Sequence, residues 1–381
     1  MLRIAEAFFE TPQALAVAGG DDALAQADLV LVFAARQFFE TPDFPAQLAR
    51  LCPRALIAGC SSAGEIRAAG VSEDGCVLAA LRFQHTTLKL VSTTLAGEGD
   101  SHAAGARLAA QLRPLAPRAV LLFAPGVHVN GSALADGLAH GLGPAVAVAG
   151  GLAGDGTAFA RTYTIGPAGV ADNAVVALAL CGEALRFGAA AQGGWLPFGP
   201  ARQVTACSGN VLHALDGQPA LALYRHYLGD YAAELPASAL LFPLAILDAQ
   251  MQPSGVIRTI LGIDERAGSL ILAGSVEAGS YLQLMQAGTN HLVDAAEMAA
   301  ETLAAQTEDA AAALVLLVSC VGRRLVMGAR VDEEVEAVAA TMGSAARLIG
   351  FYSYGEIGPA GGSGHCLLNN QTMTLARIAE D

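Results

Sequence analysis

The sequence predicts an α/β fold of two lobes, in which mixed, largely buried β-sheets are flanked by helices. Short apolar runs of strand length alternate along the chain with helical segments, and this strand–helix–strand order recurs three times. Most of the runs are almost continuously apolar, which is typical of strands covered on both faces. We therefore expect helices to cover the sheets.

Each repeat can be followed along the chain. The first has predicted strands at 27–34, 54–58, 75–83 and 87–94, with a short helix at 45–51. The second has strands at 119–123, 145–149, 159–165 and 173–181, with a helix at 132–142. The third has strands at 313–319 and 366–378, a helix at 331–342, and a segment at 347–350 that leads into the stretch FYSYGEIG. These runs suggest an internal repeat of long period.

A glycine-bearing turn that closes on an acid ends the strand–helix–strand part of each repeat. The three turns are Ser62-Ala63-Gly64-Glu65, Leu152-Ala153-Gly154-Asp155 and Ser353-Tyr354-Gly355-Glu356. Superposing them makes Glu65, Asp155 and Glu356 equivalent. We expect the three acids to lie near strand ends, with at least two facing one cleft.

A different stretch separates the second and third repeats. It is predicted to hold a strand at 203–215, a turn at 215–219, a helix that begins at Pro219 and ends at Gly229, and a long helix at 281–306. We place a domain boundary near Gly217, which gives domains 26–216 and 217–377.

Composition excludes several classes of protein. Hydrophobic residues make up 54% of the 381 residues and charged residues 15%, which favours a folded chain with a large core. No apolar run reaches the roughly 18 residues of a membrane helix, so no membrane insertion is expected. The N-terminus lacks the pattern of a signal peptide. A net charge of −14 without a basic cluster argues against a nucleic-acid partner.

Cysteine usage points to a reducing compartment. The chain has seven cysteines at wide spacings and no C-x-x-C pair, which indicates neither a disulfide framework nor a structural zinc site. Buried, reduced thiols in a cytoplasmic protein are the simplest interpretation.

The glycine turns are the candidate ligand site. In open α/β sheets, ligands bind beyond the strand ends, where glycine allows close approach and an acid accepts hydrogen bonds. The alternative is that each acid bonds its own backbone. The candidate ligand-binding residues include two tyrosines that would share one face of an extended strand and wall the cleft. The candidates are Cys60, Ser61, Ser62, Glu65, Asp155, Tyr352, Ser353, Tyr354 and Glu356.

An enzyme is the alternative from another class. Cys60 or Ser61 could serve as the nucleophile of a hydrolase or transferase, which would need a partnered base. The chain contains no G-x-S-x-G elbow around Ser61, no Walker motif and no G-x-G-x-x-G after a strand. We therefore expect a protein that binds and does not catalyse.

Seven segments, in this order, resemble the FIST proteins, which are bacterial sensory modules with an N-terminal and a C-terminal FIST domain. They are GCSSAGEI (59–66), GGLAGDG (150–156), GGWLPFGP (193–200), LDGQPALALY (215–224), LPASALLFPL (235–244), GFYSYGEIGP (350–359) and NNQTMTL (369–375). The resemblance implies a cytoplasmic sensor of a small ligand. Such a sensor would signal through a separate partner, for example a sensor histidine kinase or a diguanylate cyclase or phosphodiesterase.

The resemblance also raises haem as a cofactor, because a subset of stand-alone members are nitric-oxide-sensing haem proteins. Many members carry a histidine where this chain has Asn369, so the motif does not name an axial ligand. His128 follows a predicted strand end, and His226 lies opposite the apolar face of its helix. We rank both as haem-ligand candidates ahead of His365, which lies close to the third acid turn.

Overall fold

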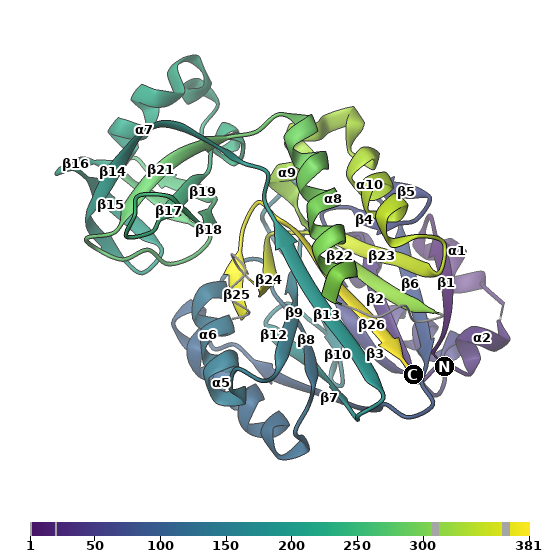
Figure 1. Cartoon of the computed structure of the whole chain (residues 1–381). Helices are drawn as coiled ribbons and strands as arrows, with labels where there is room; N and C mark the ends of the chain where they lie inside the picture. The colour runs from purple at the N-terminus through teal and green to yellow at the C-terminus, as the bar shows by residue number, and fades with distance from the viewer. Residues whose placement is uncertain (1, 20, 307–311, 360–365) are drawn as a thin grey trace.

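The computed structural model describes residues 2–19, 21–306, 312–359 and 366–381. It contains a body of three six-stranded sheets and a smaller lobe with an eight-stranded sheet, joined side by side (Figure 1). The smaller lobe is formed by the segment from β14 to β21, and the chain then returns to the body. The predicted boundary near Gly217 lies inside this lobe, next to the short strand β16.

The body consists of three units with the same order of strands. The first unit contains β1 (Arg3–Phe9), β2 (Leu29–Ala34), β3 (Leu56–Ser61), β4 (Glu65–Arg67), β5 (Gly70–Ser72) and β6 (Cys76–Arg82). The second contains β7 (Thr87–Thr94), β8 (Ala119–Ala124), β9 (Ala147–Leu152), β10 (Thr164–Gly166), β11 (Gly169–Ala171) and β12 (Ala174–Cys181). The third contains β13 (Leu185–Gln192), β22 (Ala313–Cys320), β23 (Ala346–Ser353), β24 (Gly355–Pro359), β25 (Cys366–Asn369) and β26 (Met373–Glu380).

The pairing of strands repeats in the same way. In each unit the two strands joined by helices run parallel, as β2–β3, β8–β9 and β22–β23 do, and the last strand pairs antiparallel with the first of them. The predicted internal repeat is therefore confirmed. The N-terminal strand β1, which pairs with β6 along its length, is absent from the sequence prediction.

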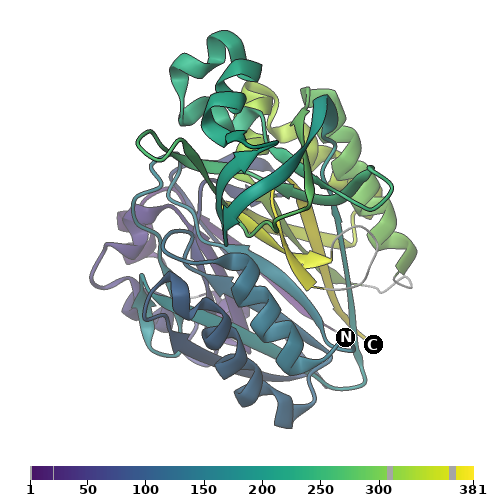
Figure 2. The same ribbon diagram turned by 90° about the vertical axis from the view of Figure 1, so that its left-hand side faces the viewer.

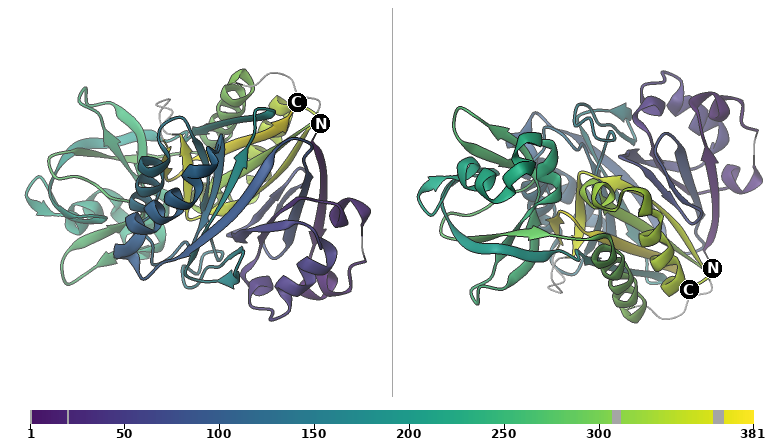
Figure 3. Two further views of the ribbon diagram at one scale, coloured as in Figure 1. Left: turned by 90° about the horizontal axis from the view of Figure 1, so that it is seen from below. Right: turned by 90° about the horizontal axis from the view of Figure 1, so that it is seen from above.

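Each unit gives its short hairpin to the sheet of another unit. The first sheet has the order β1-β6-β2-β3-β10-β11, so it ends on the hairpin of the second unit. The second sheet ends on β24 and β25 of the third unit, and the third sheet ends on β4 and β5 of the first. The exchange runs around the three units in one direction and closes them into one body. Figure 3 shows this body from below and from above, beside the smaller lobe.

The interior between the sheets is filled with side chains. Phe33, Phe123 and Phe351 come from the three units and form one aromatic cluster, with ring centroids 4.5 to 6.3 Å apart. Aliphatic residues of all three sheets pack around them. Rings at these separations contribute favourable edge and stacking contacts in addition to their burial. The centre of the body is therefore a packed core.

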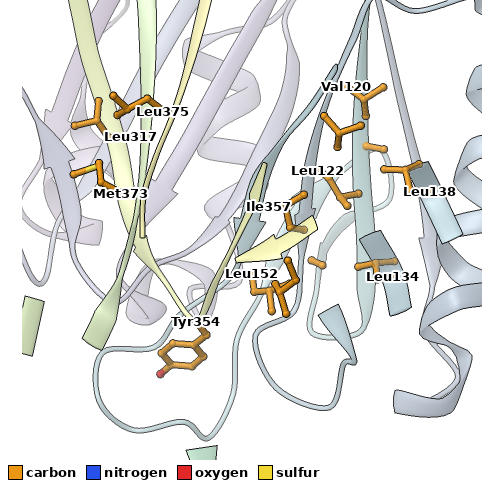
Figure 4. Packing of buried hydrophobic residues seen from close by; sticks show 14 of the residues in the cluster. Val120, Leu122, Leu134, Leu138, Leu152, Leu317, Tyr354, Ile357, Met373 and Leu375 are labelled. Carbon is orange, nitrogen blue, oxygen red and sulfur yellow. The ribbon is translucent and has the colours of Figure 1, made fainter. Parts of the chain in front are cut away.

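Helices cover the outer faces of the sheets, as the near-continuous apolar strands predict. They are α1 (Pro12–Val17), α2 (Asp22–Ala25), α3 (Arg36–Phe39), α4 (Phe44–Leu51), α5 (Ser101–Leu112), α6 (Gly131–Leu142), α8 (Thr289–Gln306), α9 (Val321–Met327) and α10 (Asp332–Met342). Figure 2 shows α5 and α6 side by side on one flank. Val120 and Leu122 of β8 pack towards Leu134 and Leu138 of α6 (Figure 4).

The smaller lobe corrects two predictions. The segment at 203–215 is not one strand, because β14 ends at Ser208, the chain turns through Gly209 at φ 61°, and β15 begins at Val211. The predicted helix at 281–306 is a strand followed by a helix, β21 and α8. The sequence YLQLMQ has the alternation of a strand, with its leucines buried. The prediction missed the strand because a long helical pattern follows it directly.

The strands of the lobe are β14 (Leu196–Ser208), β15 (Val211–Leu215), β16 (Gln218–Pro219), β17 (Leu244–Leu247), β18 (Pro253–Arg258), β19 (Ile260–Asp264), β20 (Ser269–Leu272) and β21 (Tyr281–Gln286). Its helix is α7 (Ala220–Leu228), which begins one residue after Pro219 as expected. In the part of the chain that the structure describes, no helix is long and apolar enough to cross a membrane.

Candidate functional site

Three glycines define which residues of the three units are equivalent. Gly59, Gly150 and Gly350 each lie opposite a residue of the parallel neighbouring strand. A Cβ added to any of them would lie 1.8 to 2.0 Å from that residue's carbonyl oxygen. Only glycine fits this close approach of two backbones. The three positions are therefore the same position of the fold.

The turns that follow these glycines interlock in a ring. Gly154 N donates to Ser61 O at 2.9 Å, Ala63 N donates to Tyr352 O at 2.8 Å, and Tyr354 N donates to Leu152 O at 3.3 Å. Counted from the three glycines, each bond joins the same two positions. The end of the body where the turns meet is thus held by a cycle of backbone hydrogen bonds between units.

This register corrects the superposition of the three acids. Glu65 pairs with Phe351 and Glu356 pairs with Gly151, which are equivalent residues counted from Gly350 and Gly150. The residue that pairs with the corresponding Cys60 is Thr164. Thr164, and not Asp155, therefore occupies the place of the two glutamates. The simple alignment of the turns failed for two reasons. It was one residue out of register in the second turn, since the ring makes Gly154 equivalent to Ala63 and Tyr354, and the second unit carries additional residues between its turn and its hairpin.

Glu65 and Glu356 are buried and bonded to their own units. Glu65 accepts hydrogen bonds from the hydroxyls of Ser62 and Ser72 and from Gly75 N. Glu356 accepts one from Ser353 Oγ at 2.5 Å and two at 3.1 Å from the backbone N–H and hydroxyl of Thr372. Burial nevertheless raises the pKa of Glu65 to about 7 and that of Glu356 to about 8.

Asp155 begins the additional segment, residues 155–163, which we call the insert. Its carboxylate accepts hydrogen bonds from Ala160 N at 3.1 Å and Arg161 N at 2.8 Å, and it lies 3.5 Å from the guanidinium of Arg36 in α3. It also accepts a hydrogen bond from the hydroxyl of Tyr354. Asp155 therefore connects all three units of the body.

The two tyrosines of the third turn point to different partners. The hydroxyl of Tyr352 donates to Glu334 of α10 at 2.5 Å, inside a buried ion pair of Glu334 with Arg323. Tyr354 bonds to Asp155, and its ring stacks on Phe159 of the insert at 4.1 Å. Figure 4 shows Tyr354 beyond the strand ends, apart from the aliphatic residues. The two tyrosines therefore do not form one wall of a common cleft, because their hydroxyls bond to different acids, Glu334 and Asp155.

The first turn lies inside the protein. Cys60, Ser61 and Ser62 are at most 2% exposed. Burial raises the pKa of the Cys60 thiol well above its usual range, which disfavours the thiolate that a nucleophile needs. Ser61 Oγ accepts a hydrogen bond from Tyr163 N at 2.9 Å. These contacts hold the first turn against the second unit.

Neither described histidine among the haem-ligand candidates lies in an apolar cavity, which is what an axial ligand requires. His128 is exposed, with φ 59°, and borders a cavity of about 350 Å³ that the ion-paired Arg161 and Asp172 also line. His226 is exposed on α7 and lies edge-on to Tyr227. His365 lies outside the described residues. Haem and nitric oxide remain predictions from the resemblance alone.

A larger cavity lies between the body and the smaller lobe. It has a volume of about 510 Å³, in the range of small-molecule sites. One wall is the insert, the second comes from the lobe, and the third is Leu325 of α9. The residues that line it are Thr157, Ala158, Phe159, Glu234, Pro236, Ser238, Leu240, Leu241, Ile260, Leu261 and Leu325.

The cavity adjoins the predicted turns without containing them. Phe159 lines it and stacks on Tyr354, and Gln371, beside the third turn's partner Thr372, donates from Nε2 to Leu240 O at 3.0 Å. The lining residues are absent from the sequence prediction. The sequence did contain one signal for them: the second unit is longer than the other two between its turn and its hairpin. An insertion in one repeat often lies on a binding face.

Comparison with known proteins gives the family. The FIST N domain model matches residues 28–218, and the FIST C domain model matches residues 220–359. Two uncharacterized proteins, from Mycobacterium bovis and Mycobacterium tuberculosis, are each 27% identical over 244 residues. That segment spans 62% of this chain and 62% of each relative. A cyanuric acid hydrolase from A. caulinodans is a distant structural likeness, with a TM-score of 0.37 and 11% identity over 100% of this chain and 99% of the other.

From the two domain matches, the chain belongs to the FIST family and carries a FIST N domain followed by a FIST C domain.

Proposed function

We propose that this protein is a sensor that binds a small ligand between its two FIST domains and reports it to a separate partner protein, without catalysis. FIST domains are associated with sensing and signal transduction. The observation that carries the proposal is the cavity of about 510 Å³, since residues 157–159 come from the FIST N domain and the rest of the lining from the FIST C domain.

The chemistry of the lining supports binding. Apart from Thr157, Glu234 and Ser238, the described lining is apolar. Ser238 Oγ already donates to Tyr231 O at 2.7 Å. Burying apolar ligand surface in such a cavity is favourable by roughly 25 cal/mol per Å². Cys60 and Ser61, the nucleophiles of the enzyme alternative, are not among the residues of this cavity.

The contacts of the insert suggest how binding is reported. A ligand against Phe159 touches the segment that Asp155 anchors, and Asp155 bonds to Tyr354 of the third unit and lies beside Arg36 of the first. A two-domain cavity also couples ligand binding to the relative position of the domains, because a ligand stabilises the arrangement it binds best. The partner is a sensor histidine kinase or a diguanylate cyclase or phosphodiesterase, as the resemblance implies.

Native mass spectrometry of protein purified from its own host tests the proposal. Wild-type protein is expected to carry a small-molecule adduct. Leu241→Trp fills the cavity and is expected to lose that adduct, whereas Ile271→Trp, at an exposed position of the smaller lobe, is expected to keep it. An adduct that survives in Leu241→Trp with unchanged affinity would place the ligand elsewhere.

A further inference from the structure

The cavity between the body and the smaller lobe is lined by negative charge only. Glu234 is the only ionisable side chain among the described lining residues, and it is exposed. No lysine, arginine or histidine is among those lining residues. A lone carboxylate beside an apolar cavity attracts a cationic ligand group and repels an anionic one. The chain's net charge of −14 adds to this preference at long range.

The body of the ligand has to match the rest of the lining. Leu240, Leu241, Ile260, Leu261 and Leu325 supply aliphatic surface from three different elements. Leu325 is 39% exposed, so part of its apolar surface is free to contact a ligand. Because Ser238 is already bonded, the described lining offers few groups that could orient a polar ligand. The body of the ligand is therefore apolar.

Phe159 provides a flat surface for that body. Its ring lies 4.1 Å from the ring of Tyr354 at an interplanar angle of 14°, and its backbone N–H donates to the Tyr354 hydroxyl at 3.2 Å. Its φ is 49°, a conformation that is rare for a bulky residue and recurs where a protein holds a ligand. These contacts fix the ring in place before a ligand arrives, so a ligand does not have to order it.

The location of Phe159 in the fold is a further, independent observation. Units one and three pass directly from their turns into β4 and β24, whereas unit two interposes the insert before β10. The symmetry of the body needs no such segment, since the exchanged hairpin of unit two pairs in the same register as the other two. Residues 157–159 of the insert, the segment that breaks the symmetry, line the cavity.

We propose that this cavity binds a small aromatic amine, that is, a molecule with a flat apolar body and one protonated nitrogen. The aromatic body stacks on Phe159, as aromatic rings in proteins do at separations of 4.5–7 Å between centroids. The ammonium group lies at Glu234. The assignment rests on the proposed function and adds the chemical class of the ligand.

Three matched probes test the assignment with the full-length protein. They are 2-phenylethylamine, 2-phenylethanol and 3-phenylpropionate, which share a phenyl ring on a short chain and differ in charge. Dissociation constants are measured by isothermal titration calorimetry at low salt. The amine is expected to bind about two- to fivefold more tightly than the alcohol, in keeping with one exposed ion pair, and the carboxylate is expected to bind least tightly.

Variants separate the two contacts. Glu234→Gln is expected to bring the affinity for the amine to that for the alcohol and to leave the alcohol unchanged. Phe159→Leu is expected to weaken all three probes, whereas Phe159→Tyr, which keeps an aromatic ring, is expected to retain them. Circular dichroism and thermal unfolding of each variant show whether it is folded.

The outcomes distinguish this assignment from the proposed function. Equal affinities for amine and carboxylate, an unchanged amine affinity in Glu234→Gln, or no binding of any probe would overturn the aromatic amine. If the alcohol binds and Leu241→Trp abolishes that binding, the cavity itself is still a ligand site. Binding of the alcohol that Leu241→Trp leaves unchanged would reject the cavity, and with it both proposals.

Discussion

Glu65 and Glu356 occupy the same place in two different sheets. Each accepts a hydrogen bond from the serine three residues before it and another from the backbone N–H that follows its hairpin, at Gly75 and Thr372. In the second unit Thr164 stands there, and its hydroxyl donates to Ala174 O at 2.8 Å. One polar side chain thus fastens each exchanged hairpin to the start of the strand that follows it.

The two glutamates predict a loss of stability on raising the pH. Their folded pKa values, about 7 and about 8, lie above the ordinary value of 4.5, so the folded state binds more protons in this range. The stabilising contribution is fully present below pH 4.5 and is lost as the pH rises through 7 to 8. The free energy of unfolding should fall between pH 5 and pH 8 by about 2–4 kcal/mol for each carboxyl, and more for Glu356 than for Glu65.

Urea unfolding at several pH values measures this fall. Glu356→Gln should flatten the profile, because the amide stays neutral and can donate to Ser353 Oγ while accepting from Thr372 N. A profile in Glu356→Gln as steep as in the wild type would show that Glu356 does not titrate in this range.

Tyr354→Phe should destabilise the protein by about 1–3 kcal/mol, since buried donors and an acceptor lose their partner. The hydroxyl bonds to the Asp155 carboxylate and accepts hydrogen bonds from the backbone N–H groups of Asp155 and Phe159. Tyr281→Phe, at a position that is 36% exposed, is the control and should leave the unfolding midpoint unchanged. Equal effects of the two changes would show that the hydrogen bonds of the Tyr354 hydroxyl do not stabilise the fold.

Two adjacent acids of α10 should respond differently to the same change. Glu334→Gln leaves the fully buried Arg323 without its counter-charge and should cost about 3–5 kcal/mol of unfolding free energy. Glu333→Gln removes only an exposed pair with Arg330 and should have no measurable effect. Thermal unfolding of both variants provides the comparison, and a mild effect of Glu334→Gln would mean that the buried pair relaxes.

Gly350→Ala should prevent stable folding, because its Cβ would lie 1.8 Å from Leu317 O between two paired strands. Gly99→Ala is the matched control, since nothing lies within 4 Å of the added atom. The yield of folded protein and its circular dichroism spectrum measure both. A folded Gly350→Ala variant would show that β22 and β23 can separate at this point.

Thiol labelling tests the enzyme alternative. In the native protein a thiol reagent should reach the partly exposed Cys181, Cys207 and Cys366 before Cys60, which is fully buried. Full labelling of Cys60 should require denaturant. Selective labelling of Cys60 in the native state would instead support a nucleophile there.

Sequence reasoning found most of the body and less of the site. Apolar runs located the longer buried strands of the three units within a few residues, because strands covered on both faces leave a continuous signal. The strands β1 and β13 and most of the short hairpin strands were not found. The predicted strand at 159–165 is mostly the insert, and the predicted strand at 366–378 is two strands, β25 and β26. The exchange of hairpins could not be predicted, since Glu65 of β4 pairs with Phe351 of β23, far along the chain, and no local pattern encodes that partner. The Asp155 alignment failed for the same reason: only the pairing of Thr164 with Cys60 reveals the true register.

The exchanged hairpins also determine when the body can be completed during synthesis. The first sheet has all its strands once residue 171 has emerged from the ribosome, but the second needs β25 and the third needs β26, which ends at Glu380. Until then β9 and the β4–β5 hairpin lack their partners and leave open sheet edges, which favour aggregation. A premature stop codon even late in the gene would therefore damage two sheets at once, one of them begun by the first quarter of the chain.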